Sequence, residues 1–185
     1  MTTVFLSGSR KIGRIGEEVR RRMDNMIENR LAIVVGDANG ADKAMQSYLA
    51  ELKYSDVTIY FVGDAPRNNV GRWPARNVRV NAKLSGRDFY AQKDSEMARI
   101  ADLGFVVWDG KSSGSVQNML NLLTEGKLVV VYLALEKQFY NFKTLDDLVE
   151  LLVRCDDDTL DDIGRKIALP EILRRANRKQ TALNL

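Results

Sequence analysis

Small and polar residues follow an apolar run in the stretch from Gly104 to Gln117, which reads GFVVWDGKSSGSVQ. The apolar part predicts a buried β-strand, and the residues from about Ser115 onward predict a helix. A parallel strand that turns through small residues into a helix presents backbone N–H groups and the positive end of the helix dipole to an anion. The sequence therefore predicts an anion-binding turn. Its candidate residues are Asp109, Gly110, Ser112, Gly114 and Ser115.

Two more turns of small residues follow predicted strands nearer the N-terminus. One follows the strand at residues 3–7 (TVFLS), and the other, DANGAD, follows the strand at residues 32–36 (AIVVG). Because the carboxyl ends of parallel strands meet at one edge of a sheet, we expect the three turns to share a site. Asp42 is equally compatible with a ligand contact and with complementing the dipole of its helix. The two turns add Gly8, Ser9, Arg10, Gly36, Gly40 and Asp42 to the candidate binding residues.

A basic segment between Ala65 and Arg87 contains no acidic residue. The net charge of the whole chain is only +3, so this local excess indicates an anion site more than a general nucleic-acid surface. A loop as long as residues 63–87 is usually functional, and we expect it to close over a ligand as a cationic lid. Arg72 is its candidate ligand contact.

Several aromatic residues could stack on a planar ligand group. Trp73 is the favoured candidate because it lies in the basic segment. Tyr90 is also a candidate, whereas Phe89 and Trp108 are expected in the core.

The chain has no histidine, which excludes imidazole acid–base catalysis, His-ligated zinc and Ser-His or Cys-His nucleophiles. The candidate general bases are Asp94, Glu96 and Asp109. Glu96 also fits a solvated helix face, and Asp109 also fits an Asp-Gly turn. No metal-ligand set is predicted, and no cofactor is required, although an all-oxygen Mg²⁺ site is compatible with these carboxylates.

The chain lacks two common nucleotide-binding motifs. Residues 8–13 have the G-x4-G spacing of a Walker A loop, but Arg14 and Ile15 stand where that loop needs Lys and Ser or Thr. The chain also lacks a G-x-G-x-x-G turn followed by an acid, the usual fingerprint for NAD.

Strand and helix patterns alternate through the first 134 residues. Strands are predicted at 3–7, 32–36, 57–62, 104–108 and 128–133, with helices at about 14–30, 41–52, 88–101 and 115–125. This alternation predicts an α/β fold with a Rossmann-like open parallel sheet of about five strands, in the order 3-2-1-4-5, and helices on both faces.

After Leu135 no further strand is evident, and helices are predicted. Thr144 and Thr159 each precede an Asp by three residues, which predicts two helix starts of the capping-box type. Pro170 is expected in the first turn of a third helix, and the tail from Arg174 is expected to fray. We therefore divide the chain into a ligand-binding domain, 1–135, and a helical C-terminal extension packed on it, 136–185.

Four motifs in this order resemble the SLOG superfamily, the Rossmann-like group that includes LOG, YspA and DprA-type proteins. They are GSR, GDANGAD, KDSEM at residues 93–97 and WDGKSSGS at residues 108–115. The similarity spans about residues 3–134 and is closest to YspA-like proteins. It implies a nucleotide or nucleotide-derived ligand at the carboxyl edge of the sheet, and it adds Lys93 and Asp94 to the binding residues.

Two residues depart from the family pattern. LOG-type phosphoribohydrolases carry a catalytic glutamate where this chain has Asn118, and an amide cannot act as a base. Lys93 stands where many relatives have Arg, which keeps the charge but loses bidentate geometry.

We therefore expect a protein that binds or senses a nucleotide. A nucleotide or nucleoside hydrolase is the first alternative, and single-stranded nucleic-acid binding is the second. The longest apolar run, 128–135, is too short to cross a membrane, and the single Cys155 suits a reducing compartment. We expect a cytoplasmic homodimer without a signal peptide or a membrane partner.

Overall fold

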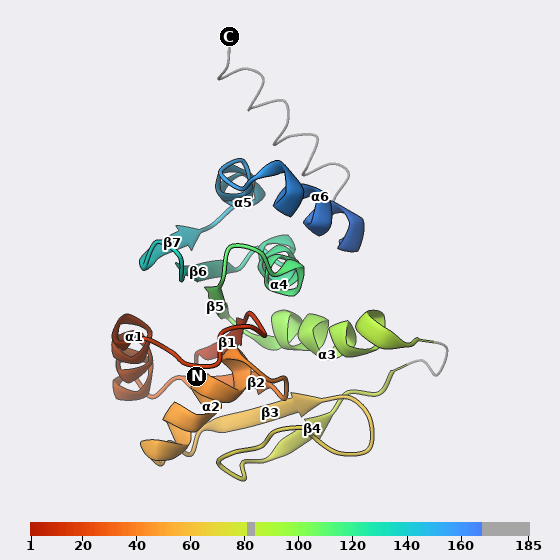
Figure 1. The fold of residues 1–185 in the computed structure, drawn as a ribbon. Helices are drawn as coiled ribbons and strands as arrows, with labels where there is room; N and C mark the ends of the chain where they lie inside the picture. Colours follow the sequence, from red (N-terminus) through yellow and green to blue (C-terminus); the bar gives the residue numbers. More distant parts are fainter. Residues whose placement is uncertain (81–83, 168–185) are drawn as a thin grey trace.

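A seven-stranded sheet organises the molecule in the computed structural model, which describes residues 1–80 and 84–167 (Figure 1). Its strand order is β4-β3-β2-β1-β5-β6-β7. The strands are β1 (Thr3–Gly8), β2 (Ala32–Gly36), β3 (Val57–Phe61), β4 (Ala75–Asn77), β5 (Leu103–Trp108), β6 (Leu128–Leu133) and β7 (Gln138–Phe142).

The five strands that the sequence predicts form the middle of this sheet. Every neighbouring pair from β4 to β6 is parallel, and the order β3-β2-β1-β5-β6 is the predicted order 3-2-1-4-5. The Rossmann-like α/β fold is therefore confirmed. The strand order reverses between β1 and β5, and their paired carboxyl ends, Gly8 and Val107, mark the point at which open α/β sheets bind ligands.

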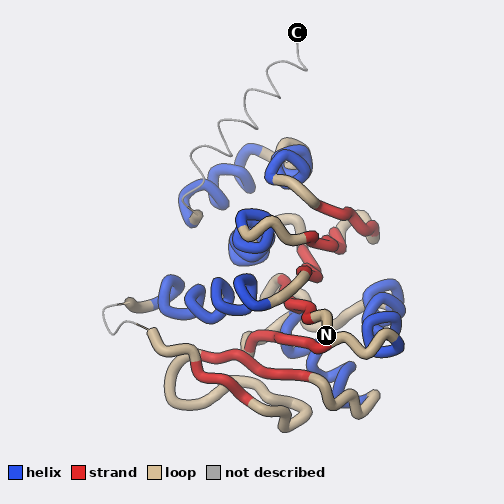
Figure 2. The backbone as a smooth tube through the Cα atoms, turned by 180° about the vertical axis from the view of Figure 1, so that it is seen from behind, coloured by secondary structure: helices blue, strands red, loops and turns tan. Residues whose placement is uncertain are grey.

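Helices cover both faces of the sheet, and Figure 2 shows the strands as a twisted band between them. α1 and α2 pack on one face, where they share a core with alternate residues of the strands such as Leu6 and Val35. α3 to α6 pack on the other face with Phe5 and Val34. The helices are α1 (Glu17–Glu28), α2 (Ala41–Glu51), α3 (Gly86–Ile100), α4 (Ser113–Thr124), α5 (Leu145–Leu152) and α6 (Asp157–Lys166).

Two edge strands are absent from the sequence prediction. β4 lies in the segment expected to be irregular, and all three of its residues are exposed. β7 pairs antiparallel with β6, so the expectation of no strand after Leu135 was wrong. Only Phe142 of β7 is buried, and an edge strand of this kind has no alternating apolar pattern to reveal it.

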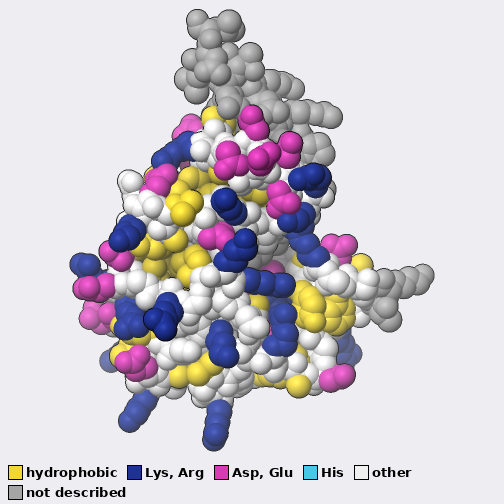
Figure 3. Space-filling view, in the orientation of Figure 1, with side chains coloured by type: hydrophobic (Ala, Val, Ile, Leu, Met, Phe, Trp, Pro, Cys, Tyr) yellow, Lys and Arg dark blue, Asp and Glu magenta, His cyan; other side chains and the backbone are white. Residues whose placement is uncertain are grey.

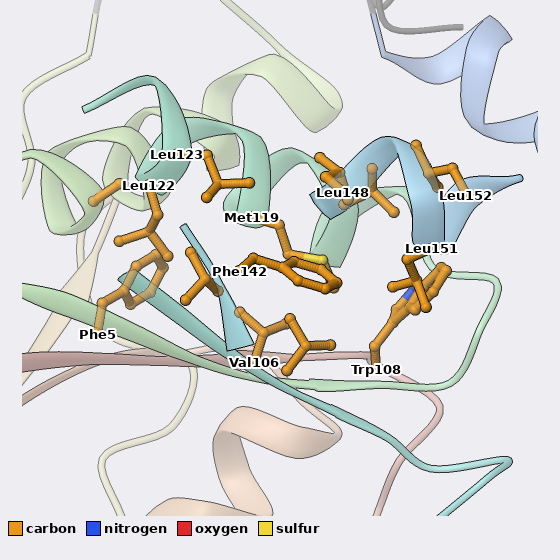
Figure 4. Close-up of a cluster of buried hydrophobic side chains, with 14 of the residues drawn as sticks. Phe5, Val106, Trp108, Met119, Leu122, Leu123, Phe142, Leu148, Leu151 and Leu152 are labelled. Carbon is orange, nitrogen blue, oxygen red and sulfur yellow. The ribbon is translucent and has the colours of Figure 1, made fainter. Parts of the chain in front are cut away.

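The C-terminal helices share the core of the sheet. In Figure 4, Phe142 of β7 and Leu148 and Leu152 of α5 lie in one cluster with Met119 of α4 and Trp108 of β5. The expected core position of Trp108 is confirmed, since its side chain is 1% exposed. The division of the chain at residue 135 stays a prediction.

Helix starts after residue 135 follow side-chain caps. Thr144 and Asp147 form the expected capping box at α5. The second start was wrong by three residues, because Asp156 caps α6 by accepting a hydrogen bond from the N–H of Thr159. Pro170 and the tail from Arg174 lie outside the described residues. No helix in the described part of the chain is long and apolar enough to cross a membrane.

Candidate functional site

A cleft of about 950 Å³ opens at the carboxyl ends of β1 and β5. Its walls come from the turn after β1, from α3, from the start of α4 and from α6. Arg87 of α3 donates a hydrogen bond to the carbonyl of Lys166 in α6, which joins two of these walls. The helical C-terminal region therefore borders the site.

The turns after β1 and β5 are joined by hydroxyl and carboxylate groups. The Ser9 Oγ donates to Asp109 Oδ1 at 2.9 Å and accepts from the Asp109 N–H at 3.0 Å. It also lies 3.1 Å from Ser115 Oγ. Asp109 Oδ1 further accepts from the N–H groups of Lys111 and Ser112 at 3.0 and 2.8 Å. Asp109 thus shapes the turn that leads into α4.

The N-terminus of α4 faces this cleft through Ser113, Gly114 and Ser115. The first N–H groups of a helix have no partner within the helix, and Ser112 at the N-cap makes no side-chain hydrogen bond to them. These donors and the helix dipole can hold an anion.

Cationic side chains also line the cleft near that helix end. They are Arg10 and Lys11 from the turn after β1 and Lys111 from the turn after β5. Figure 3 shows Lys and Arg side chains gathered across the middle of this face, with acidic side chains above them over α5 and α6. Arg87 of α3 and Lys166 of α6 also line the cleft, so the basic groups are not confined to the start of α4.

Three carboxylates surround one buried lysine beside the cleft. Lys93 Nζ lies 2.5 Å from Asp94 Oδ1 and 4.0 Å from Asp37 Oδ1. Burial lowers the pKa of Lys93, but the charges of Asp94, Asp42 and Asp37 outweigh burial and raise it. Burial raises the pKa of Asp42 to about 7, despite the opposing charge of Lys93.

Gly36 leaves room for this charged cluster. A Cβ at this position would lie 2.6 Å from Asp42 Oδ2 and 2.7 Å from Lys93 Nζ, so these side chains would have to shift to admit it. Gly36 itself is buried and does not line the cleft. Its place in the site is to admit Asp42 and Lys93.

Gly40 allows two turns to pack together. Its φ is +83°, and a Cβ there would overlap the backbone of Arg10. The turn after β2 therefore lies directly against the turn after β1, which is where Ala41 N–H donates to the Ser9 carbonyl at 3.1 Å. Gly8, in contrast, lines the cleft.

Arg67 and Tyr90 form a pair beside the lysine cluster. Arg67 donates to both carboxylate oxygens of Asp37, from Nε at 2.9 Å and from Nη2 at 2.6 Å. The Arg67 guanidinium lies 4.3 Å from the centroid of the Tyr90 ring. Burial raises the pKa of Asp37, but the hydrogen bonds from Arg67 and the charge of Lys93 hold it below its usual value.

The basic segment is attached to the body of the protein. Trp73 is only 8% exposed and packs in the core with the α1–α2 face of the sheet, and its Nε1 donates to the Tyr54 carbonyl at 2.7 Å. The structure therefore places Trp73 away from the cleft, contrary to the stacking role expected for it. Arg72 is exposed and does not line the cleft either. Lys83 lies outside the described residues.

The candidate bases have other partners. Asp94 lines the cleft but is paired with Lys93. Glu96 lies outside the lining and pairs with Arg99 at 2.9 Å, and this hydrogen bond lowers its pKa. Asn118 lines the cleft and donates to the Ser7 Oγ at 2.6 Å. In residues 1–80 and 84–167 no group of three or more His, Cys, Asp or Glu side chains is arranged to hold a metal ion.

The structure brings most of the predicted site together. Within the cleft lining lie Gly8, Arg10, Asp42, Lys93, Asp94, Asp109, Ser112, Gly114 and Ser115. Ser9 is fully buried behind the lining. Gly110, like Gly36, Gly40, Arg72 and Trp73, does not contribute to it.

Several residues of the site were not among the candidates from the sequence. Asp37 is one of them, although it follows β2 in the DANGAD turn. Tyr90 was a stacking candidate, but Trp73 was favoured over it. The acidic residues of α6 carry no motif, and only the fold brings them to the cleft. These α6 residues are Asp156, Asp158 and Asp162, the first of which caps the helix.

Comparisons with family models and with curated proteins found no match. A solved structure of DNA processing protein A (DprA) from Helicobacter pylori, described by its single-stranded DNA binding mode, matches with a TM-score of 0.56. The match covers 89% of this chain and 79% of that chain, at 15% sequence identity. Similarity at this identity concerns the fold, and the closer relation to YspA-like proteins stays a prediction. The chain therefore has a fold similar to that of DprA.

Proposed function

We propose that this protein binds a nucleotide or a nucleotide-derived ligand in the cleft between α3, α4 and α6. One observation carries the proposal: the N-terminus of α4 meets the turn after β1 at the point of strand-order reversal, inside a cleft lined by Arg10, Lys11 and Lys111. Backbone N–H groups, a helix dipole and side-chain cations together favour a phosphate group.

The dimensions of the cleft suit a ligand of this size. Its volume of about 950 Å³ lies near the upper end of the range of about 300–1,000 Å³ for small-molecule sites. The charge is unevenly divided. Arg10, Lys11 and Lys111 lie about the start of α4, whereas α6 carries Asp158 and Asp162, the second of which is paired with Lys166. A ligand with an anionic group at one end and a neutral or amino-bearing group at the other fits this division.

Binding is favoured over hydrolysis because the expected bases have other roles. Asp109 accepts hydrogen bonds that shape its turn, and Asp94 pairs with Lys93. Asn118 replaces the glutamate on which the LOG-type reaction depends. A sensing role and a homodimer stay predictions that accompany the proposal.

A pair of substitutions at Gly114 tests phosphate binding. A Cβ at Gly114 meets only Ser112 Oγ, at 3.9 Å, so a side chain can begin there without overlap at a position that lines the cleft. Gly114→Glu places a carboxylate beside the proposed phosphate, while Gly114→Gln has nearly the same shape without the charge. In calorimetric titrations with AMP, we expect Gly114→Glu to weaken binding at least roughly tenfold more than Gly114→Gln does.

Two results would contradict the proposal. If the wild-type protein bound neither AMP, GMP, CMP nor UMP, the cleft would not be a nucleotide site. If both variants lost the same affinity, the loss would come from obstruction and not from anion recognition. Chromatography of AMP after long incubation with Mg²⁺ provides the separate test for hydrolysis, and unchanged AMP is the expected result.

Single-stranded DNA is the second candidate. The similarity of fold to DprA, whose solved structure is described by its single-stranded DNA binding, favours it. The carboxylates of α6 along the cleft oppose it, because they repel a chain of phosphates.

A further inference from the structure

One aromatic ring, that of Tyr90, belongs to the described residues that line the cleft. Three neighbouring positions on the same face of α3 also line it, Arg87, Ala91 and Asp94. Arg87 and Asp94 lie three and four residues from Tyr90, and Ala91 lies four and three residues from Arg87 and Asp94, so the four positions form one continuous stripe of the helix. Ala91 extends only a methyl group into this stripe, which leaves space beside the Tyr90 ring.

We propose that Tyr90 stacks against the base of the bound nucleotide, an inference that rests on the proposed function. Planar bases stack on aromatic rings through dispersion and desolvation, whatever their hydrogen-bonding pattern. The inference assigns the base to the α3 wall of the cleft and the phosphate to the start of α4.

Arg67 lies over one face of the Tyr90 ring. The Arg67 guanidinium lies 4.3 Å from the ring centroid, and Arg67 is not part of the cleft lining. Tyr90 does line the cleft, so the proposed stacking uses the face opposite Arg67. Phe89 meets the same ring edge-on at a centroid distance of 5.3 Å.

The ring is also held in place before a ligand binds. Arg67 is fixed by the two side-chain hydrogen bonds to Asp37 and by a third from its own backbone N–H, at 3.1 Å. The Asp37 side chain is fully buried, so water does not compete with Arg67 for its carboxylate. A ring that is already ordered loses little entropy on binding.

The other tryptophan and tyrosine candidates do not offer this arrangement. Trp73 and Trp108 are 8% and 1% exposed and belong to the two cores. Tyr60 is also buried, at 2% exposed. Tyr90 is half-buried and borders the cleft.

Titrations with AMP and with ribose 5-phosphate test the assignment, because both ligands carry the phosphate and only AMP carries a base. For Tyr90→Ala we expect AMP affinity to fall roughly 5- to 100-fold, as is usual for loss of one base-stacking ring. Ribose 5-phosphate affinity should stay unchanged. Tyr90→Phe, which keeps the ring, should retain AMP affinity within about threefold.

Tyr90→Leu serves as a second variant if Tyr90→Ala fails to fold, since it keeps apolar volume but removes the ring. Its expected effect is the same selective loss of AMP. An equal loss of both ligands, or no loss of AMP, would overturn the stacking role while leaving the nucleotide site intact. If the wild-type protein bound ribose 5-phosphate but not AMP, the base would have no place in the cleft. Failure to bind either ligand would overturn the proposed function itself.

Discussion

Asp42 shows how the fold changes the chemistry of a single residue. It occupies the first turn of α2, where the sequence suggests either a ligand contact or a partner for the helix dipole. In the structure its side chain lines the cleft and lies within the Asp37–Lys93–Asp94 cluster. Burial raises its pKa to about 7, so its charge changes near neutral pH.

The pKa of Asp42 makes stability depend on pH in a defined direction. Between the unfolded value of 3.8 and the folded value of about 7, the folded protein binds the proton more tightly than the unfolded chain does. The stabilisation is fully present below the unfolded pKa and is lost as pH rises through the folded pKa. Asp42→Asn removes this titration.

We therefore expect the free energy of unfolding of Asp42→Asn, relative to wild type, to increase from about pH 4 to about pH 8, by up to about 4 kcal/mol. Urea unfolding over this pH range measures the difference. Asp64→Asn, at an exposed carboxylate, is the matched control. If the free energy of unfolding of Asp42→Asn relative to wild type stayed constant or fell as pH rises, burial would not raise the pKa of Asp42.

The aromatic residues show which parts of the site the sequence could not predict. Residue type and the basic neighbourhood favoured Trp73 for stacking, but burial depends on contacts made by distant segments, such as its hydrogen bond to Tyr54. Tyr90 depends in the same way on Arg67 and Asp37, which no local pattern connects to it. The serine and glycine turns were predictable because strand endings are local and a parallel sheet brings them together.

At the scale of elements, the sequence was informative wherever the hydrophobic pattern was strong. The central strands carry nearly continuous apolar runs, as buried parallel strands do. β4 and β7 are edge strands, and Phe142 is the one buried residue that the two strands contain. Their place in the sheet therefore depends on backbone pairing and not on an apolar pattern. The place of α6 beside the cleft depends on the packing of α5 and α6 on α4.

The capping box at the start of α5 should contribute to the stability of the helix. Thr144 Oγ1 accepts from the Asp147 N–H at 3.3 Å, and Asp147 Oδ2 accepts from the Thr144 N–H at 2.8 Å. We expect Thr144→Ala to lower the free energy of unfolding by about 1 kcal/mol. Ser47→Ala is the control, because Ser47 is exposed and donates only to a carbonyl one turn earlier. If Thr144→Ala lowered the free energy of unfolding no more than Ser47→Ala does, the capping box would not stabilise α5.

At the scale of the whole molecule, the division of charge along the cleft separates the two candidate functions. Arg10, Lys11 and Lys111 lie about the start of α4, and α6 carries Asp158 and Asp162 together with Lys166. A single nucleotide can place its phosphate at the start of α4 and make no contact with the carboxylates of α6. A strand of nucleic acid that follows the cleft must bring phosphates close to the carboxylates.

Reversing one charge on α6 tests this separation. We expect Asp158→Lys to strengthen binding of an oligothymidylate severalfold at low salt while changing AMP affinity little. Fluorescence anisotropy with labelled oligothymidylate measures the first effect. Glu28→Lys, the same change of charge on α1 outside the cleft, is the control. Tight binding of the oligonucleotide by the wild-type protein, without competition from AMP, would favour the DNA-binding alternative.

A crystal structure of the protein with AMP would show directly whether the nucleotide binds in the cleft. We expect the phosphate within hydrogen-bonding distance of the N–H groups of residues 113–115, the first turn of α4, with Arg10 or Lys111 beside it. The base should lie against the face of Tyr90 opposite Arg67. An unoccupied cleft in crystals soaked well above the dissociation constant measured by titration, or a phosphate bound away from α4, would show that the nucleotide site is not here.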